Sequence, residues 1–245
     1  MNFEGRAVLV TGGTRGIGKA IAQRFASLGV ARIALGYLRN DAAAEEAAGE
    51  LREAGAEPVL VRGNVASERV AAELASYGPY DAIVHNAATG VIRPALETED
   101  KHWDWTLGAN ARALLSLARA CAPDMKQGSS IVGVSSLGSI RVLENYVLVG
   151  TSKAALESVV RYLAVELAPR GIRVNAVSAG VVDTEALEYF PNREQMLKAA
   201  QTRTPAGRMV EPEDVAAAVI YLCSREAEMV RGHTLIVDGG YSLLA

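Results

Sequence analysis

A tyrosine and a lysine in the second half of the chain have side chains that together could carry out acid chemistry. Tyr146 precedes Lys153 by seven positions, within a stretch that predicts one long helix from about 146 to 167. Positions seven apart lie on the same helical face, about 10 Å apart along the axis. A free phenol has a pKa near 10, and a nearby ammonium lowers that pKa by favouring the phenolate. The pair therefore predicts an acid or oxyanion donor that works near neutral pH.

Each of these side chains also has a plainer interpretation. Taken alone, Tyr146 is a partly buried aromatic at the start of a helix, and Lys153 is a solvated helix charge. Ser136, at the end of a predicted strand, supplies either a second donor or a structural hydroxyl bond to the backbone. The acid interpretation therefore depends on what surrounds the pair.

A glycine-rich turn near the N-terminus predicts a phosphate-binding loop. Gly12, Gly16 and Gly18 follow directly on the predicted strand Ala7–Thr11 and open the predicted helix Gly18–Leu28. The first glycine allows a sharp turn, the second lets the backbone approach a pyrophosphate, and the third lets helix and strand pack closely. The alternative is an ordinary glycine-rich turn between a strand and a helix.

Two arginines favour NADPH over NADH as the dinucleotide. An acidic residue after the second strand would bind the adenosine ribose hydroxyls, but that strand runs into Leu38, Arg39 and Asn40. Arg39 and Arg15 could both reach a 2′-phosphate, which suits the planar guanidinium. Alternatively, Arg39 is a solvated loop charge beside Asp41.

The elements that must position these residues alternate between strands and helices. This alternation predicts an α/β fold with a doubly wound parallel sheet of the Rossmann type, in a single domain spanning residues 1–245. The irregular segment Val182–Arg208 is expected to form a small helical substrate lid. The predicted elements are Ala7–Thr11, Gly18–Leu28, Arg32–Tyr37, Ala42–Ala54, Glu57–Arg62, a short helix, Tyr80–His85, Trp105–Ala120, Ser130–Ser135, Tyr146–Leu167, Arg173–Val177 and Thr234–Val237.

The composition excludes several classes of function. A formal charge of −3 and a pI near 5.7 give no basic surface for nucleic acid. No apolar run reaches membrane-spanning length, so we expect a cytoplasmic protein without membrane contact. Cys121 and Cys223 are expected to be buried fillers. The three histidines, His85, His102 and His233, lack metal-ligand spacing and are expected to be structural.

Several separate motifs resemble the short-chain dehydrogenase/reductase family, and the resemblance covers essentially the whole chain. The motifs are Thr11-Gly12-x-x-x-Gly16-x-Gly18, Asn86-Ala87-Ala88, Asn110, Ser135-Ser136 and Asp238-Gly239-Gly240. In that family, the asparagine that Asn110 resembles holds a proton-relay water, and the one that Asn86 resembles supports the adenine side. Two departures are a short segment from Asn64 to Asn86, which implies a trimmed third helix, and Asn64 itself where the family usually has Asp. Asn64 could still present a carbonyl oxygen, with an amide orientation that its partners must decide.

The spacing of tyrosine and lysine departs from the commonest pattern of the family. Most members place the active tyrosine four positions before the lysine, where this chain has Val149, which cannot donate a proton. The spacing of Tyr146 and Lys153 resembles that of the enoyl-acyl-carrier-protein reductases, and the stretch 136–154 is similar to theirs. The nearest resemblance is to type III, in which a serine, here Ser136, replaces an extra tyrosine.

The resemblance implies a set of functional residues. The implied catalytic residues are Tyr146, Lys153, Ser136 and Asn110. The implied cofactor-binding residues, with Lys153 on the nicotinamide ribose, are Gly12, Thr14, Arg15, Gly16, Ile17, Gly18, Arg39, Asn64, Val65, Asn86, Lys153, Gly180, Val182 and Thr184.

The implied activity is the NADPH-dependent reduction of the 2,3 double bond of an enoyl thioester in fatty acid biosynthesis. The acyl thioester is expected on an acyl carrier protein, the assembly as a homotetramer, and the acyl chain in an apolar channel near 143–148 and 187–190. One alternative is a ketoreductase for a 3-oxoacyl thioester or a secondary metabolite. A second is a non-catalytic dinucleotide-binding module, which would be expected to lose Tyr146 or Lys153.

Overall fold

A seven-stranded, fully parallel sheet forms the centre of the molecule, as the sequence predicts. The computed structural model describes residues 1–244. The strand order is β3-β2-β1-β4-β5-β6-β7, so the chain reverses its direction of winding between β1 and β4. Ligands of such sheets bind at this switch point, beyond the carboxyl ends of the strands. The strands are β1 Ala7–Thr11, β2 Arg32–Tyr37, β3 Glu57–Arg62, β4 Ala82–His85, β5 Ser130–Ser136, β6 Arg173–Ala179 and β7 Thr234–Val237.

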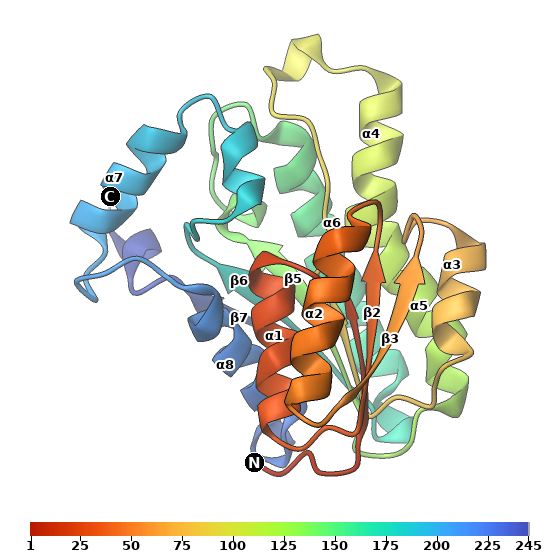
Figure 1. Ribbon diagram of the computed structural model, residues 1–245. Helices are drawn as coiled ribbons and strands as arrows, with labels where there is room; N and C mark the ends of the chain where they lie inside the picture. Colours follow the sequence, from red (N-terminus) through yellow and green to blue (C-terminus); the bar gives the residue numbers. More distant parts are fainter. Residues whose placement is uncertain (245) are drawn as a thin grey trace.

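Helices cover both faces of the sheet and bury two separate cores. One face packs against α1 Gly16–Ser27, α2 Asp41–Glu53 and α8 Pro212–Cys223. The other face packs against α3 Glu68–Ala75, α5 Ala113–Cys121 and α6 Val147–Glu166. Figure 1 shows α4 Asp100–Leu107 projecting at the top of the molecule and α7 Arg193–Arg203 on the outside at the left. The central strands are apolar without alternation because both of their faces are covered.

Two helical regions differ from the prediction. The helix expected over 105–120 is divided into α4, a π-helical turn at Gly108–Arg112 and α5. Extra residues of this kind inside a helix re-aim side chains and often occur at functional sites. The helix α8 is missing from the predicted elements, because 215–223 is a nearly continuous apolar run in which a period of 3.6 is hard to recognise.

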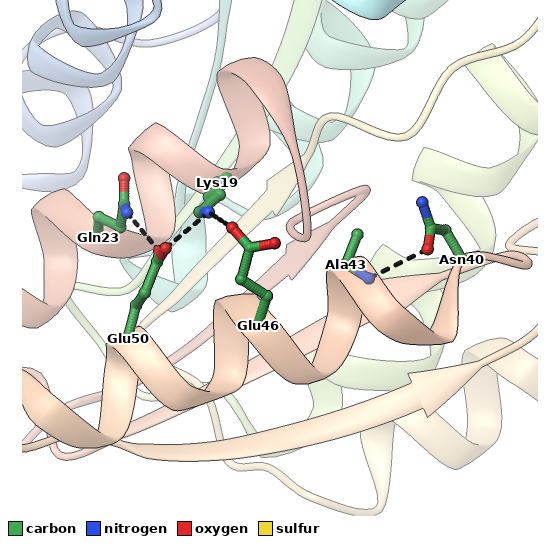
Figure 2. A network of polar contacts seen from close by, with 6 residues as sticks. All are labelled: Lys19, Gln23, Asn40, Ala43, Glu46 and Glu50. Carbon is green, nitrogen blue, oxygen red and sulfur yellow. Dashed lines mark hydrogen bonds and ion pairs between the residues drawn. The ribbon is translucent and has the colours of Figure 1, made fainter.

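A polar network fixes α2 against α1 (Figure 2). The Lys19 ammonium donates to Glu46 at 2.9 Å and to Glu50 at 2.8 Å, and Gln23 donates to Glu50 at 2.7 Å. The Asn40 side chain caps α2 by accepting from the Ala43 backbone N–H at 3.0 Å. The network holds the loop before α2, which carries Arg39, at a fixed place beside the start of α1.

The expected lid is partly helical. Residues 182–208 contain a 3-10 segment, Glu185–Tyr189, followed by α7. Val182 and Val210 form an isolated parallel bridge that ties the two ends of the segment together. Among residues 1–244, no helix combines the length and apolar character needed to cross a membrane.

Candidate active site

The glycines of the first turn are required by close contacts. A Cβ on Gly18 would lie 2.0 Å from the Gly12 carbonyl oxygen, and a Cβ on Gly12 would lie 2.9 Å from the Ala87 Cα. Gly12 and Gly16 have φ angles of +63° and +50°, a region that side-chain-bearing residues rarely adopt. These contacts explain the spacing of all three glycines.

The beginning of α1 suits an anionic group. Arg15 precedes the helix without a side-chain cap, and the first turn contains no acidic residue. The first backbone N–H groups of a helix lack intrahelical partners, and together with the helix dipole they attract negative charge. Near Gly16 an added Cβ would find only the Thr184 side chain, at 3.4 Å. The turn therefore fits the pyrophosphate expected from the sequence.

Asn86 and Thr11 connect the glycine turn to the end of β4. The Asn86 side-chain amide donates to the Gly12 carbonyl at 2.9 Å, and the Thr11 hydroxyl accepts from the Ala87 backbone N–H at 3.2 Å. The Thr11 hydroxyl also lies 3.0 Å from Nδ1 of His85. Both residues thus hold the expected cofactor loop to the neighbouring strand at the switch point.

His85 lies fully inside this connection. Its Nε2 is 3.1 Å from the Ala109 carbonyl and 3.2 Å from the Asn110 carbonyl, so Nε2 must carry the proton and Nδ1 accepts from the Thr11 hydroxyl. Burial, with a smaller effect from the Lys153 charge, lowers the pKa of His85 to about 4. His85 is therefore a neutral structural bridge, as expected, and no group of three metal-binding side chains occurs among residues 1–244.

Asn110 lies in the π-helical turn and is fully buried. Its amide oxygen accepts from the Thr89 backbone N–H at 2.8 Å, and its Nδ2 donates to the Thr89 carbonyl and the Ser152 hydroxyl, each at 2.8 Å. Both amide hydrogens are thus used by the protein. In this structure Asn110 positions the loop after β4 against α6, and the water-holding role implied by the resemblance stays a prediction.

Tyr146 immediately precedes α6 and points its hydroxyl towards Ser136. The phenol donates to the Ser136 hydroxyl across 3.5 Å, and that hydroxyl also accepts from the Gly138 backbone N–H at 3.2 Å. Gly138 is necessary here, because a Cβ at this position would lie 2.4 Å from the tyrosine ring. The ring also contacts Phe190 of the lid, with the ring centroids 5.6 Å apart.

The Ser136 hydroxyl accepts from the Gly138 backbone N–H and from the phenol, and its role as a second donor stays a prediction. Burial raises the pKa of Tyr146, and the Ser136 hydrogen bond opposes that rise. The lowering expected from Lys153 is absent in this arrangement, because burial is the largest influence on the phenol.

Lys153 is 5% exposed, and its ammonium donates to the Val134 carbonyl at 2.7 Å. Burial lowers the pKa of Lys153 to about 8, and the negative charge of Glu157 opposes that lowering. The solvated-charge interpretation of Lys153 is therefore wrong. Lys153 is on α6 and Tyr146 is the residue just before that helix, and the joint acid role expected for the pair stays a prediction.

Val149 fills the position four residues before Lys153. It is 7% exposed, and a Cβ on Gly90 would lie 2.2 Å from its Cγ2. The Val149 side chain is thus packed against the loop that follows β4. A phenol has no room there without a shift of that loop.

The two arginines expected at a 2′-phosphate have different environments. Arg15 forms an ion pair with Glu185 of the lid. Asp41 pairs with Arg62 at 3.1 Å and accepts from the Tyr37 hydroxyl at 2.9 Å. Arg39 is exposed and forms no ion pair within residues 1–244. Asp41, the neighbour that could have paired with Arg39, therefore binds Arg62 and Tyr37 instead.

The remaining expected cofactor residues lie after β3, after β6, in or near the glycine turn, and at the start of the lid. Asn64 follows β3, and its side-chain oxygen accepts from the Ala66 backbone N–H at 3.0 Å, which sets the amide orientation. Gly180 follows β6, where a Cβ would lie 3.0 Å from Asp238. The others are Thr14, which is buried, Ile17, which packs on the core, Val65, which is partly buried after β3, and Val182 and Thr184, which begin the lid.

Two buried groups near Tyr146 and Lys153 have roles that the sequence analysis did not assign to them. Glu157 was not among the expected site residues, although a glutamate one turn after Lys153 on an apolar helix was the available signal. His85 was recognised as structural, but its partners 74 and 25 positions away were not foreseeable. Cys121 and Cys223 are buried, as expected.

Comparisons with known proteins agree with this geometry. Residues 12–242 match a family model described as "Enoyl-(Acyl carrier protein) reductase". The 1-cyclohexenylcarbonyl-CoA reductase of Streptomyces collinus is 36% identical, over 97% of this chain and 87% of that protein. The D-xylose 1-dehydrogenase of Caulobacter vibrioides is 35% identical, over 98% of this chain and 97% of that protein. The L-sorbose reductase of Gluconobacter frateurii, solved with NADPH and L-sorbose, is 28% identical with a TM-score of 0.91 and covers 100% and 99% of the two chains. A short-chain dehydrogenase of Burkholderia cenocepacia, solved with NADP, is 30% identical with a TM-score of 0.90 and covers 99% and 100%.

Proposed function

The chain belongs to the short-chain dehydrogenase/reductase family of nicotinamide-dinucleotide-dependent oxidoreductases, and we propose that it uses NADPH to reduce the 2,3 double bond of an enoyl thioester. One observation carries this proposal: the buried Lys153 has its phenol seven positions upstream, while Val149 fills the position four upstream. The description of the matching family model and the relative named for a cyclohexenylcarbonyl-CoA thioester support the same reaction.

The placement of the phenol suits conjugate reduction. In an enoyl thioester the hydride goes to the β-carbon, while negative charge develops on the thioester oxygen. The oxyanion donor must therefore stand farther from the carbon that receives hydride than it does in the reduction of a ketone. Moving the phenol by almost one helical turn, from position 149 to position 146, gives a displacement of about 4.5 Å along the axis in that sense.

Each residue of the site then has a separate task. Bound NADPH supplies the hydride. The glycine turn and the start of α1 hold its pyrophosphate, and the Lys153 ammonium binds the nicotinamide ribose. The Tyr146 hydroxyl, which donates to Ser136 in this structure, would turn its one proton to the developing enolate oxygen, with the Ser136 hydroxyl as a second donor. Phe190 of the lid packs against the phenol ring and would help to keep water from it.

The preference for NADPH follows from the unpaired guanidinium of Arg39. The acidic neighbour Asp41 is held by Arg62 and Tyr37, so Arg39 keeps its positive charge available to a 2′-phosphate. Arg15 is the second candidate, once it leaves Glu185. Two solved relatives contain NADPH and NADP, which supports the same cofactor.

A ketoreductase remains the second candidate function. It is favoured by relatives whose names refer to sugars, namely D-xylose 1-dehydrogenase at 35% identity and L-sorbose reductase at 28%. In this alternative Tyr146 protonates a carbonyl oxygen of a 3-oxoacyl thioester or another ketone. The burial of Val149 weighs against it, because the usual position of the phenol is filled.

The direct test is NADPH oxidation with crotonyl thioester beside acetoacetyl thioester, each presented on coenzyme A and on acyl carrier protein. We expect turnover of the crotonyl substrate and little of the acetoacetyl one, with the carrier-protein thioester preferred if the reaction belongs to fatty acid biosynthesis. Faster reduction of the acetoacetyl substrate would replace the proposal by the ketoreductase.

We also propose that the chain assembles as a homotetramer through α5 and α6. Their outer faces expose Leu115, Tyr162 and Val165, which are 40%, 70% and 75% exposed in the single chain. Apolar side chains on paired helices favour association with a symmetry-related copy. Light scattering at micromolar concentration is expected to give four times the chain mass of 25.8 kDa, and a monomer mass would contradict the proposal.

A further inference from the structure

A buried glutamate lies one helical turn beyond Lys153. Glu157 is on α6, 7% exposed, and its Oε1 accepts from the Ser135 hydroxyl at 2.5 Å. A carboxylate this deep in a protein requires charged or hydrogen-bonding partners, because burial alone disfavours its charge. For Glu157, the Ser135 hydroxyl is one such partner.

Glu157 and Lys153 contact consecutive residues of the same strand. The Lys153 ammonium donates to the Val134 carbonyl, and the next residue of β5, Ser135, donates to Glu157. Residue 136, at the end of this strand, carries the hydroxyl that faces the phenol. The strand therefore holds both charged side chains in a fixed register behind the site.

We propose that Glu157 is a positioning residue, which keeps Lys153 in its ammonium form and thereby sustains the charge that the cofactor ribose requires. This inference rests on the proposed function only because that function assigns the Lys153 ammonium to the cofactor ribose. The negative charge of Glu157 raises the pKa of Lys153 against the lowering caused by burial. Without this charge, burial would act unopposed and the lysine would be neutral over more of the physiological range.

The other titratable groups around the pair do not replace Glu157. From β4, His85 faces Lys153 and is neutral above a pH of about 4. From the start of α6, the phenol of Tyr146 is kept protonated by its burial. Within residues 1–244, Glu157 is thus the one acidic side chain that acts on the Lys153 ammonium.

On its far side Glu157 lines a pocket of about 320 Å³. Arg161 of α6 and His233, just before β7, are the charged and titratable side chains that share this pocket. The Ser178 hydroxyl from β6 also lines it and is buried without a hydrogen-bond partner among residues 1–244.

The test compares Glu157→Gln with Glu166→Gln, which removes an exposed charge from the same helix. The titration of Lys153 is followed by NMR of ¹³C-labelled lysine in the free protein, with its signal assigned from Lys153→Met. We expect Glu157→Gln to lower the midpoint by about one pH unit, the lower end of the range that a nearby opposite charge produces. Glu166→Gln is expected to leave it unchanged. An unchanged midpoint in folded Glu157→Gln overturns the proposal.

A second readout is the pH profile of kcat. Its alkaline limb is expected to move to lower pH with the lysine midpoint, whereas a merely structural role would lower kcat at every pH without moving the limb. If Glu157→Gln does not fold, Glu157→Asp retains the charge but retracts it, and a smaller downward shift of the same sign is expected; no shift refutes the proposal. The lysine titration needs no substrate, so inactivity of the wild type towards both thioesters would count against the proposed function alone.

Discussion

The two sides of the site are built differently. Around the glycine turn, His85, Asn86 and Asn110 bond to the backbone of segments far away in the sequence, and these contacts are buried or partly buried. The lid is mostly exposed and meets the rest of the site through Arg15–Glu185 and Phe190–Tyr146. A rigid cofactor side beside an adaptable substrate side would explain how the relatives carry the names of different substrates, namely cyclohexenylcarbonyl-CoA, D-xylose and L-sorbose.

The largest effect is expected where the two sides meet, at the phenol. Tyr146→Phe should lower kcat by roughly two to three orders of magnitude, the scale of removing one oxyanion donor, because ring packing is retained and only the hydroxyl is lost. The affinity for NADPH, measured by fluorescence titration, should stay near wild type. Tyr189→Phe is the matched control, since this lid phenol is 75% exposed. An unchanged kcat in Tyr146→Phe would remove the phenol from the mechanism.

The stability of the rigid side should depend on pH through the titration of His85. Its pKa is about 4 in the folded protein and about 6.5 in an unfolded chain, so the unfolded chain takes up the proton first as the pH falls. The stability that neutral His85 contributes is thus present above about 6.5 and is lost on approach to 4, by about 3 kcal/mol. Urea unfolding at several pH values measures this slope. His85→Gln should flatten it, whereas His233→Gln, at an exposed position, should not. An equal slope in His85→Gln would contradict the neutral bridge.

Arg39 tests whether the cofactor side discriminates by charge. Arg39→Ala should weaken the binding of NADPH roughly tenfold, since a hydrogen bond to a charged group contributes about 1.5–3 kcal/mol. The dissociation constant of NADH should change little. Arg52→Ala removes another exposed charge of the same region and serves as the control. Equal losses for both cofactors would sink the assignment of the 2′-phosphate to Arg39.

The smallest effect is expected on the adaptable side. Phe190→Leu removes the ring that faces Tyr146 and should raise KM for the enoyl thioester a few-fold, given about 0.5–1.5 kcal/mol for a pair of aromatic rings. Binding of NADPH in the absence of substrate should not change. A loss of cofactor affinity as large as the change in KM would show that the lid belongs to the rigid side.

Local patterns explain what the sequence could predict. The alternation of strands and helices, the glycine turn and the Tyr146–Lys153 spacing all lie within short stretches, and the structure has them where they were expected. The bridge from Thr11 through His85 to Asn110 joins residues 74 and 25 positions apart, so no local pattern could indicate it. Burial, and not the charge of Lys153, sets the direction in which the pKa of Tyr146 shifts. This result likewise depends on packing that only the folded chain supplies.

The most direct measurement of the central claim is a competition between crotonyl and acetoacetyl thioesters with NADPH carrying deuterium in the transferred position. The products are identified by mass spectrometry and NMR. We expect butyryl thioester with one deuterium on C3 and one solvent-derived hydrogen on C2, and the loss of this product in Tyr146→Phe. Deuterium found mainly on the carbinol carbon of 3-hydroxybutyryl thioester, with crotonyl thioester left unreduced, would contradict the account.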